Sequence, residues 1–145
     1  MLGAVLAKRE VRKGFDALNR HDLDTLMDMF HDDGVFEFPS DTTMGGRYEG
    51  REAIRDWFER WYDRLPENRF TLHHISVENI FALGATNVAH VEWEDEETDR
   101  DGNVFRMTGV TAFEVEGGKA RLVKDYIFDQ DVLAEIWPPK GSVVA

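Results

Sequence analysis

Four stretches in the second half of the chain are rich in β-branched and aromatic residues, and short turn-forming segments separate them. The stretches cover residues 69–82, 86–98, 103–116 and 119–129. The separating turns fall at Leu83 and Gly84, at residues 99–102, and at Gly117 and Gly118. Consecutive strands joined by such short connections pair antiparallel. This half of the chain is therefore predicted to form an antiparallel meander.

The first half of the chain carries apolar residues at helical spacing. Val11, Phe15 and Leu18 form one apolar stripe. A second apolar stripe runs along the helix predicted over 51–65, which ends just before Pro66. The predicted helices cover residues 4–19, 22–30 and 51–65, with Asp22 as the N-cap of the second. The other predicted elements are a short strand at 35–38, a loop at 40–50, a last helical turn capped by Asp131, and a frayed tail over 140–145. Helices that precede a sheet in the chain predict an α+β fold, with the helices packed on one face of a curved antiparallel sheet around a pocket.

Composition and charge limit the classes of protein to which the chain can belong. Its 145 residues suffice for one domain with a hydrophobic core, and we expect 1–145 to form it. A net charge of −12, with scattered Lys and Arg, argues against a nucleic-acid partner. The chain has no cysteine and no apolar run near the roughly 18 residues of a membrane span. The charges at Lys8 and Arg9 follow the first apolar stretch, whereas a signal peptide has them before it. We expect a cytoplasmic protein without a membrane partner.

Asp125 is the most informative single residue. Side chains alternate across a strand, so Asp125 shares a face with Val123 and Ile127 in the predicted strand over 119–129. A carboxylate on an apolar face is desolvated, which raises its pKa and suits it to exchange protons near neutral pH. The alternative is a structural carboxylate, bonded to a backbone N–H or to an arginine.

The order of several short motifs resembles the nuclear transport factor 2-like superfamily, in its SnoaL-like branch. The motifs are residues 19–24 (Asn-Arg-His-Asp-Leu-Asp), Phe38-Pro39, residues 50–54 (Gly-Arg-Glu-Ala-Ile), Gly118-Lys119 and residues 124–129 (Lys-Asp-Tyr-Ile-Phe-Asp). The resemblance implies a cone-shaped α+β barrel with an apolar pocket that usually dimerises through its outer sheet face. Members include polyketide cyclases, ketosteroid isomerases, limonene epoxide hydrolases and dehydratases. Other members are binding or scaffold domains without catalytic activity.

Within this family the end of the chain looks closest to the limonene epoxide hydrolases, in which the last strand carries a catalytic Asp that matches Asp125. Those enzymes also need an Arg-x-Asp pair, which strand order puts at Glu92 and Glu94. The arginine is thus absent and a glutamate replaces the aspartate. Polyketide cyclases, by resemblance, need only a buried acid such as Asp125 and a hydrophobic pocket.

The strand predicted over 86–98 admits two orientations. In the first, Ala89, Val91 and Trp93 lie in the core, and the acids of the other face lie in water. In the second, His90 and Glu92 face the pocket, and Val91 and Trp93 face a dimer partner. The acidic run over 94–97 approaches a hairpin, so most of it is expected to be solvated.

The remaining candidates are Glu37 and His73. Glu37 shares a face with Val35 on a short strand that lines the pocket in the family, and the alternative is that it faces water. His73 shares a face with Ile75, so burial would make it either a core histidine or a proton shuttle. His74 and Glu78 would lie about 13 Å apart along a strand, too far for one ion. His90 and Glu92 could approach a common ion but lack a third ligand, and the chain has no glycine-rich phosphate loop, so we expect neither metal nor cofactor.

These residues lead to two hypotheses about function. The first is a cofactor-free enzyme that uses Asp125, with Glu92, Glu37 and His73 as further catalytic candidates, on a small apolar molecule. Isomerisation, cyclisation and dehydration fit this hypothesis, and the substrate would be polyketide-, steroid- or terpenoid-like. The second is a non-catalytic ligand-binding or dimerisation domain. In either case a homodimer is expected, formed through an outer face that carries Trp93, Val91, Tyr126 and Phe128.

Overall fold

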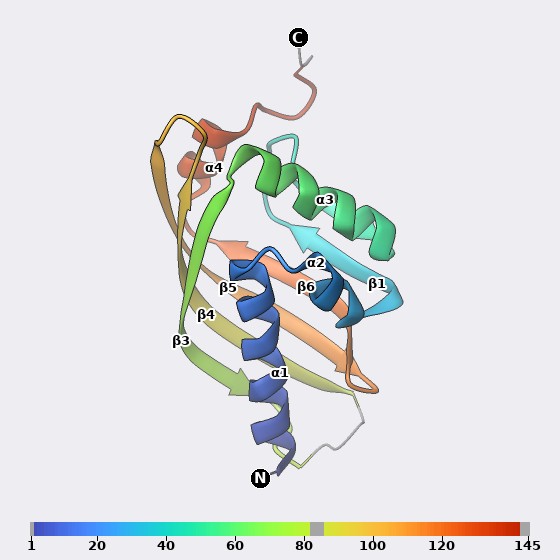
Figure 1. Ribbon diagram of the computed structural model, residues 1–145. Coiled ribbons are helices and arrows are strands. Elements are labelled where there is room, and N and C mark those ends of the chain that lie inside the picture. Colours follow the sequence, from blue (N-terminus) through green and yellow to red (C-terminus); the bar gives the residue numbers. More distant parts are fainter. Residues whose placement is uncertain (1, 82–85, 143–145) are drawn as a thin grey trace.

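The computed structural model describes residues 2–81 and 86–142, and Figure 1 shows its helices gathered over one face of a curved sheet. The helices are α1 (Leu2–Asn19), α2 (Leu23–Asp28), α3 (Arg51–Arg64) and α4 (Gln130–Ile136). The strands are β1 (Phe30–Phe38), β2 (Gly46–Glu49), β3 (Glu67–Val77), β4 (Asn87–Thr98), β5 (Val104–Glu116) and β6 (Lys119–Ile127). Within the described ranges, no helix is long and apolar enough to cross a membrane.

Amphipathic helices form the layer that covers the sheet. Helix α1 buries Val11 and Phe15, and α3 buries Ile54, Trp57 and Trp61, all at the helical spacing seen in the sequence. Their rings meet those of the sheet, since Trp57 lies 4.8 Å from Phe36 between ring centroids. The predicted α+β architecture with helices on one sheet face is therefore confirmed.

The sheet contains six strands in the order β2-β1-β6-β5-β4-β3 among the described residues. Strands β3 to β6 pair antiparallel with their neighbours, as predicted. Strand β1 instead pairs parallel with β6, so the sheet is mixed. The sheet curves around the helices but does not close, which corrects the expected barrel to an open curved sheet.

Several predicted boundaries differ from those in the structure. Strand β1 starts earlier than predicted, at Phe30, and β2 lies inside the predicted loop over 40–50. Asp129, not Asp131, occupies the N-cap position of α4, and its carboxylate accepts the backbone N–H of Thr108 instead of capping the helix. The predicted turn at 83–84 lies outside the described residues, as does the end of the predicted tail.

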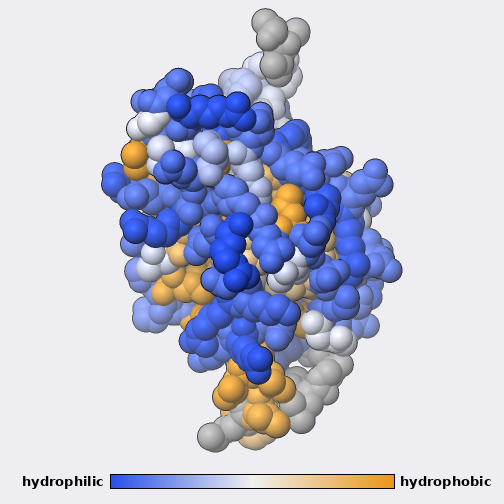
Figure 2. Space-filling model, viewed as in Figure 1, coloured by the Kyte–Doolittle hydropathy of each residue, from blue (hydrophilic) through white to orange (hydrophobic). Residues whose placement is uncertain are grey.

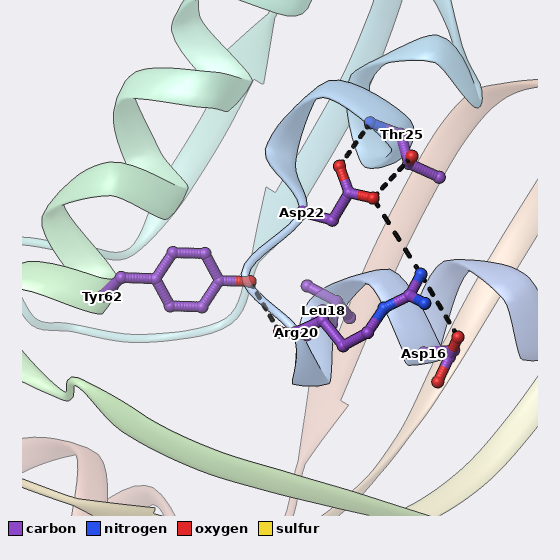
Figure 3. A network of polar contacts seen from close by, with 6 residues as sticks. All are labelled: Asp16, Leu18, Arg20, Asp22, Thr25 and Tyr62. Carbon is purple, nitrogen blue, oxygen red and sulfur yellow. Dashed lines mark hydrogen bonds and ion pairs between the residues drawn. The ribbon is translucent and has the colours of Figure 1, made fainter.

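A polar corner joins α1 to α2 (Figure 3). Asp22 caps α2 as predicted, because its side chain accepts the backbone N–H of Thr25 at 3.1 Å. Arg20 lies 3.3 Å from Asp16 and 3.9 Å from Asp22, so it links the end of one helix to the start of the next. These exposed pairs contribute little energy singly, but together with the cap they fix the direction of the chain at this corner.

Tyr62 connects the same corner to α3. Its hydroxyl donates to the carbonyl oxygen of Leu18 at 3.1 Å (Figure 3). The ring of His21 stacks on Tyr62 with 3.8 Å between centroids, and His21 adopts a left-handed φ of 56° to do so. The corner therefore links α1, α2 and α3 to one another at one place.

Candidate active site

A cavity of about 430 Å³ lies between the helices and the inner face of the sheet. Aromatic and aliphatic side chains make up most of its wall, including Phe15, Phe36, Phe58, Phe70, Trp57, Trp61, Trp93, Val123 and Ile127. The carboxyl-bearing residues on the wall are Glu10, Asp95, Glu97 and Asp125. No Lys, Arg or His is among the described residues that line it. The cavity is thus apolar, with acids as its charged groups.

Asp125 projects into this cavity from β6, on the same face as Val123 and Ile127. Its register partner on β5 is Thr111, and the Thr111 hydroxyl donates to Asp125 Oδ1 at 2.5 Å. The same hydroxyl oxygen accepts the indole N–H of Trp93 at 2.9 Å. Because Thr111 accepts from one side and donates to the other, its single hydrogen is committed to Asp125.

Burial raises the pKa of Asp125 to about 7, and the hydrogen bond from Thr111 opposes part of that rise. None of the described Lys and Arg side chains forms an ion pair with it. The alternative of a structural aspartate paired with arginine is therefore not what the structure contains. The predicted placement on an apolar face is confirmed, while a catalytic role stays a prediction.

Two further acids lie in the cavity wall and were not predicted. Asp95 and Glu97 are 3% and 0% exposed, although they belong to the acidic run that was expected to be solvated. The indole N–H of Trp61 donates to Glu97 Oε1 at 2.8 Å. The other oxygens, Asp95 Oδ1 and Glu97 Oε2, are buried without a donor from another described side chain. A proton held between these two carboxyl groups would satisfy both oxygens.

The ionisation of this pair follows from burial and mutual repulsion. Burial, followed by the charge of Asp125, raises the pKa of Asp95 to about 7. Burial, followed by the charge of Asp95, raises the pKa of Glu97 well above its usual range. The pair therefore retains a proton at neutral pH, because two adjacent buried carboxylates cannot both ionise cheaply. Burial also raises the pKa of nearby Tyr62, with Glu97 and Asp95 adding to the effect.

The structure places Glu92 outside the site. Val91 and Trp93 are buried against the helices. Because side chains alternate along β4, Glu92 and Glu94 lie on the opposite face and are exposed to solvent. The first of the two predicted orientations of this strand is the correct one, and the match of Glu92 and Glu94 to a catalytic pair is wrong. The orientation of β4 is determined by its large apolar side chains. Burial of the Trp93 indole and the Val91 isopropyl group is favourable, and the charged face of the strand stays in water.

Glu37 and His73 also lie outside the cavity that Asp125 lines. Glu37 lies on the outer face of β1, between the buried Phe36 and Phe38, and forms ion pairs with Arg47 at 2.7 Å and Lys124 at 3.5 Å. His73 lies at an irregularity of the β3–β4 register and pairs with exposed Glu94 at 3.2 Å. Neither residue lines the cavity. The placement of both in the pocket is therefore corrected.

The sequence contained one signal for the missed acids. Ala89, Val91 and Trp93 alternate with polar residues, and continuing that alternation by two more steps gives Asp95 and Glu97. The concentration of charge over 94–97 concealed the pattern. Among the described residues no group of three potential ligands is arranged to hold a metal ion.

A family model for the SnoaL-like domain matches residues 11–123. Among solved structures, Bal32a from a soil-derived mobile gene cassette is 21% identical with a TM-score of 0.79, over 93% of this chain and 98% of that one. A candidate polyketide cyclase from Xanthomonas campestris pv. campestris is 22% identical with a TM-score of 0.69, over 92% and 98%. An LEH-like epoxide hydrolase from M. tuberculosis is 23% identical with a TM-score of 0.68, over 91% and 90%. No curated protein matches the chain. At these identities the structural likenesses show the fold alone.

Proposed function

Because the chain belongs to the SnoaL-like domain family of the nuclear transport factor 2-like superfamily, we propose that it is a cofactor-free enzyme acting on a small apolar molecule. Asp125 is the general acid/base of this proposal. The observation that carries it is a carboxyl group with a pKa of about 7 at the wall of an apolar cavity. Such a group is populated in both protonation states at neutral pH, which is the condition for efficient proton transfer.

The hydrogen bond from Thr111 assigns the two oxygens of Asp125 different tasks. Oδ1 is occupied by the Thr111 hydroxyl, which leaves Oδ2 for the substrate. In an isomerisation or cyclisation, Oδ2 would remove a proton from a carbon next to a carbonyl group and return it elsewhere on the same molecule. In a dehydration, the protonated form would deliver its proton to the leaving hydroxyl, and the resulting carboxylate would take up the proton lost from the neighbouring carbon as the double bond forms. Each scheme is balanced without an external oxidant or reductant.

The pair of Asp95 and Glu97 supports the same chemistry from a second position. It lies close enough to Asp125 for their charges to interact, and it retains a proton at neutral pH. On substrate binding, the protonated acid of the pair would exchange its hydrogen bond to the neighbouring carboxylate for one to a substrate oxygen, while Asp125 acts as the base. We infer that Glu97 is the protonated member of the pair, because burial and the charge of Asp95 raise its pKa well above its usual range, although the hydrogen bond from Trp61 acts in the opposite direction.

The wall of the cavity restricts the substrate. Its aromatic lining and volume of about 430 Å³ suit a polycyclic or terpenoid-sized molecule. The acids of the wall have no lining cation to balance them within the described residues, so an anionic ligand is disfavoured. A neutral polyketide-, steroid- or terpenoid-like compound fits best. The polyketide cyclase and epoxide hydrolase among the structural neighbours are compatible with this class.

A non-catalytic ligand-binding domain is the second candidate. The observation that favours it is that both Asp125 and Glu97 have well-defined protein partners, Thr111 and Trp61. Acids held in this way can be structural features of a binding pocket.

Asp125→Asn tests the proposal, because asparagine keeps the shape and loses the transferable proton. The substrates to compare are a terpenoid epoxide, a Δ5-3-ketosteroid and a polycyclic polyketide ester. Binding is followed by quenching of tryptophan fluorescence, since Trp57, Trp61 and Trp93 line the cavity. We expect turnover of one of these classes to fall by about 10²-fold or more, with binding retained.

The control is Glu92→Gln, which removes one carboxylate from the outer face of the same sheet and should leave turnover unchanged. Binding of these probes without turnover in the wild type, or turnover that Asp125→Asn leaves unchanged, would assign the chain to the binding-domain class.

A further inference from the structure

One end of the molecule carries a group of exposed apolar side chains, visible as the orange patch at the lower end of Figure 2. In the first turns of α1, Leu2, Val5 and Leu6 are 64%, 63% and 44% exposed. The segment that follows β3 adds Ile80 and Phe81 at the same end of the molecule (Figure 1). We call these five residues the apolar tip. Exposed patches of this kind on a small domain mark an interaction surface.

Positive charge is concentrated directly behind the apolar tip. Lys8, Arg9, Arg12 and Lys13 follow it in α1, and we call these four residues the basic collar. Residues 1–13 hold these four cations and one acid, so the rest of the chain has 13 of the 17 basic residues and 28 of the 29 acidic ones. The collar is thus the basic part of a strongly acidic protein.

The collar is also free of ion pairs with the part of the chain that the structure describes, whereas most other arginines have an acidic partner, such as Arg55 with Asp24 and Arg106 with Glu96. Four cations without an ion-pair partner among residues 2–81 and 86–142 lie next to exposed apolar side chains. Together they are complementary to a layer whose surface is negatively charged and whose interior is apolar.

The apolar tip adjoins the candidate active site. Gly3, Leu6 and Ala7 of α1 belong to the wall of the cavity, together with Val88 at the start of β4 and Gly118 of the β5–β6 turn. The cavity therefore extends to this end of the molecule. A surface bound here would lie next to the space where an apolar ligand is held.

We propose that this end of the molecule docks on an anionic lipid bilayer, with the apolar tip among the acyl chains and the basic collar against the headgroups. Apolar insertion and attraction of Lys and Arg to anionic lipid are the two signals that reversible membrane binding combines. An apolar substrate dissolved in the bilayer would then reach the cavity without crossing water. The sequence-based expectation of no membrane partner rested on spanning segments, and surface docking requires none.

Other occupants fit the tip less well. Two copies meeting tip to tip would bring two basic collars together, and like charges oppose such a contact. The few side chains of the tip also supply less area than a stable protein interface buries. Nucleic acid would gain nothing from the apolar tip and would be repelled by the acidic remainder of the surface.

The experiment is flotation of the full chain with two kinds of vesicle, one of phosphatidylcholine alone and one with about one third phosphatidylglycerol. We expect binding to the second kind only, weakened by high salt because exposed charges are screened. Arg9→Gln with Lys13→Gln should lower the binding about tenfold or more. Leu2→Gln with Val5→Gln should abolish it, and Phe81→Gln should lower it independently of α1.

The matched control is Arg100→Gln in the β4–β5 turn with Lys140→Gln in the segment after α4. Both segments lie at the opposite end of the molecule (Figure 1), so this variant removes the same charge there and should leave binding unchanged. The proposal is overturned if the protein does not float with anionic vesicles, or if the control and the collar variant behave alike. It is also overturned if the tip variants change the sedimentation coefficient of the protein alone, since the tip would then be a contact between copies. None of these measurements depends on turnover, so their outcome is separate from that of Asp125→Asn.

Discussion

Thr111 and Asp125 face each other across strands β5 and β6, and the 2.5 Å hydrogen bond between them commits the only hydrogen of the Thr111 hydroxyl. The indole N–H of Trp93 fixes the direction of that bond, because it occupies the Thr111 oxygen from the other side. Three side chains on three neighbouring strands therefore determine where the free oxygen of Asp125 lies. The position of the proposed acid/base is set by the sheet itself.

Thr111→Val should raise the pKa of Asp125 further. Valine keeps the shape of threonine but removes the hydrogen bond that opposes the effect of burial. It also leaves the Trp93 N–H buried without an acceptor, which costs about 1–3 kcal/mol of stability. A carboxyl carbon NMR titration measures the pKa, and urea unfolding measures the stability. Thr108→Val is the control, since Thr108 is exposed on the same strand and bonds Asp129 instead. An unchanged Asp125 pKa in Thr111→Val would contradict the proposed link.

The stability of the protein should fall as the pH rises from about 4 to about 7. Burial raises the pKa of Asp125 from its ordinary value of 3.8 to about 7, so in this window the folded state holds a proton that the unfolded state has released. Asp95, with its pKa of about 7, acts in the same direction. A tenfold change in an acid dissociation constant corresponds to about 1.4 kcal/mol. Asp125→Asn should therefore be more stable than the wild type at pH 8 and similar to it at pH 4, as measured by urea unfolding. Glu92→Gln should retain the wild-type slope.

Gly109→Ala should destabilise the fold and displace Trp93. A Cβ atom at Gly109 would lie 2.6 Å from the carbonyl oxygen of Tyr126 and 2.7 Å from Trp93 Cζ2. Both distances are well inside van der Waals contact, so the indole must move away from Thr111. Gly14→Ala is the contrasting control, because its Cβ would meet only the flexible end of Met29 at 3.3 Å. Alanine there also favours the helix by about 1 kcal/mol. Thermal unfolding should rank Gly109→Ala below the wild type and Gly14→Ala at or above it.

A homodimer through the outer face of the sheet remains a prediction, with a corrected set of residues. Val91 and Trp93 are buried under the helices and cannot take part, whereas Tyr126 and Phe128 are 51% and 90% exposed. Phe128→Asp should shift the protein towards the monomer in sedimentation velocity at micromolar concentration. Leu2→Asp adds the same charge at another exposed apolar position and should not. A wild-type monomer would contradict the prediction directly.

The helices and the meander followed from the sequence because each depends on local pattern. Apolar residues at helical spacing placed α1 and α3, and the turn glycines placed the β5–β6 hairpin, each within a few residues of its position in the structure. The parallel pairing of β1 with β6 had no such signal, because it joins segments that are far apart in the chain. The openness of the sheet is likewise a property of the whole assembly, and the turn pattern does not encode it.

The candidate site was predictable only where charge and hydrophobic pattern agreed. Asp125 has the apolar residues Val123 and Ile127 as its neighbours on one strand face, so its burial could be predicted. Asp95 and Glu97 lie in a cluster of acids, where charge suggests solvent and alternation suggests burial, and alternation proved correct. Glu37 was predicted to line the pocket but lies on the outer face of the sheet, where it forms ion pairs with Arg47 of β2 and Lys124 of β6. Such partners become visible only when the strands are in register.

The pairing of β1 with β6 also imposes an order on folding. Strand β6 is the last strand of the sheet, yet it lies between β1 and β5 and carries Asp125. A chain emerging from the ribosome can form α1, α2 and the β3–β4–β5 meander from nearby residues. Strand β1 cannot join the sheet until β6 has been synthesised and has paired with β5, because β6 lies between β1 and β5. Long-range pairing of this kind is slow. During synthesis the aromatic wall of the cavity is therefore exposed before the strand that closes it exists, so the nascent chain passes through a stage at which a chaperone, or the ligand itself, can bind that wall.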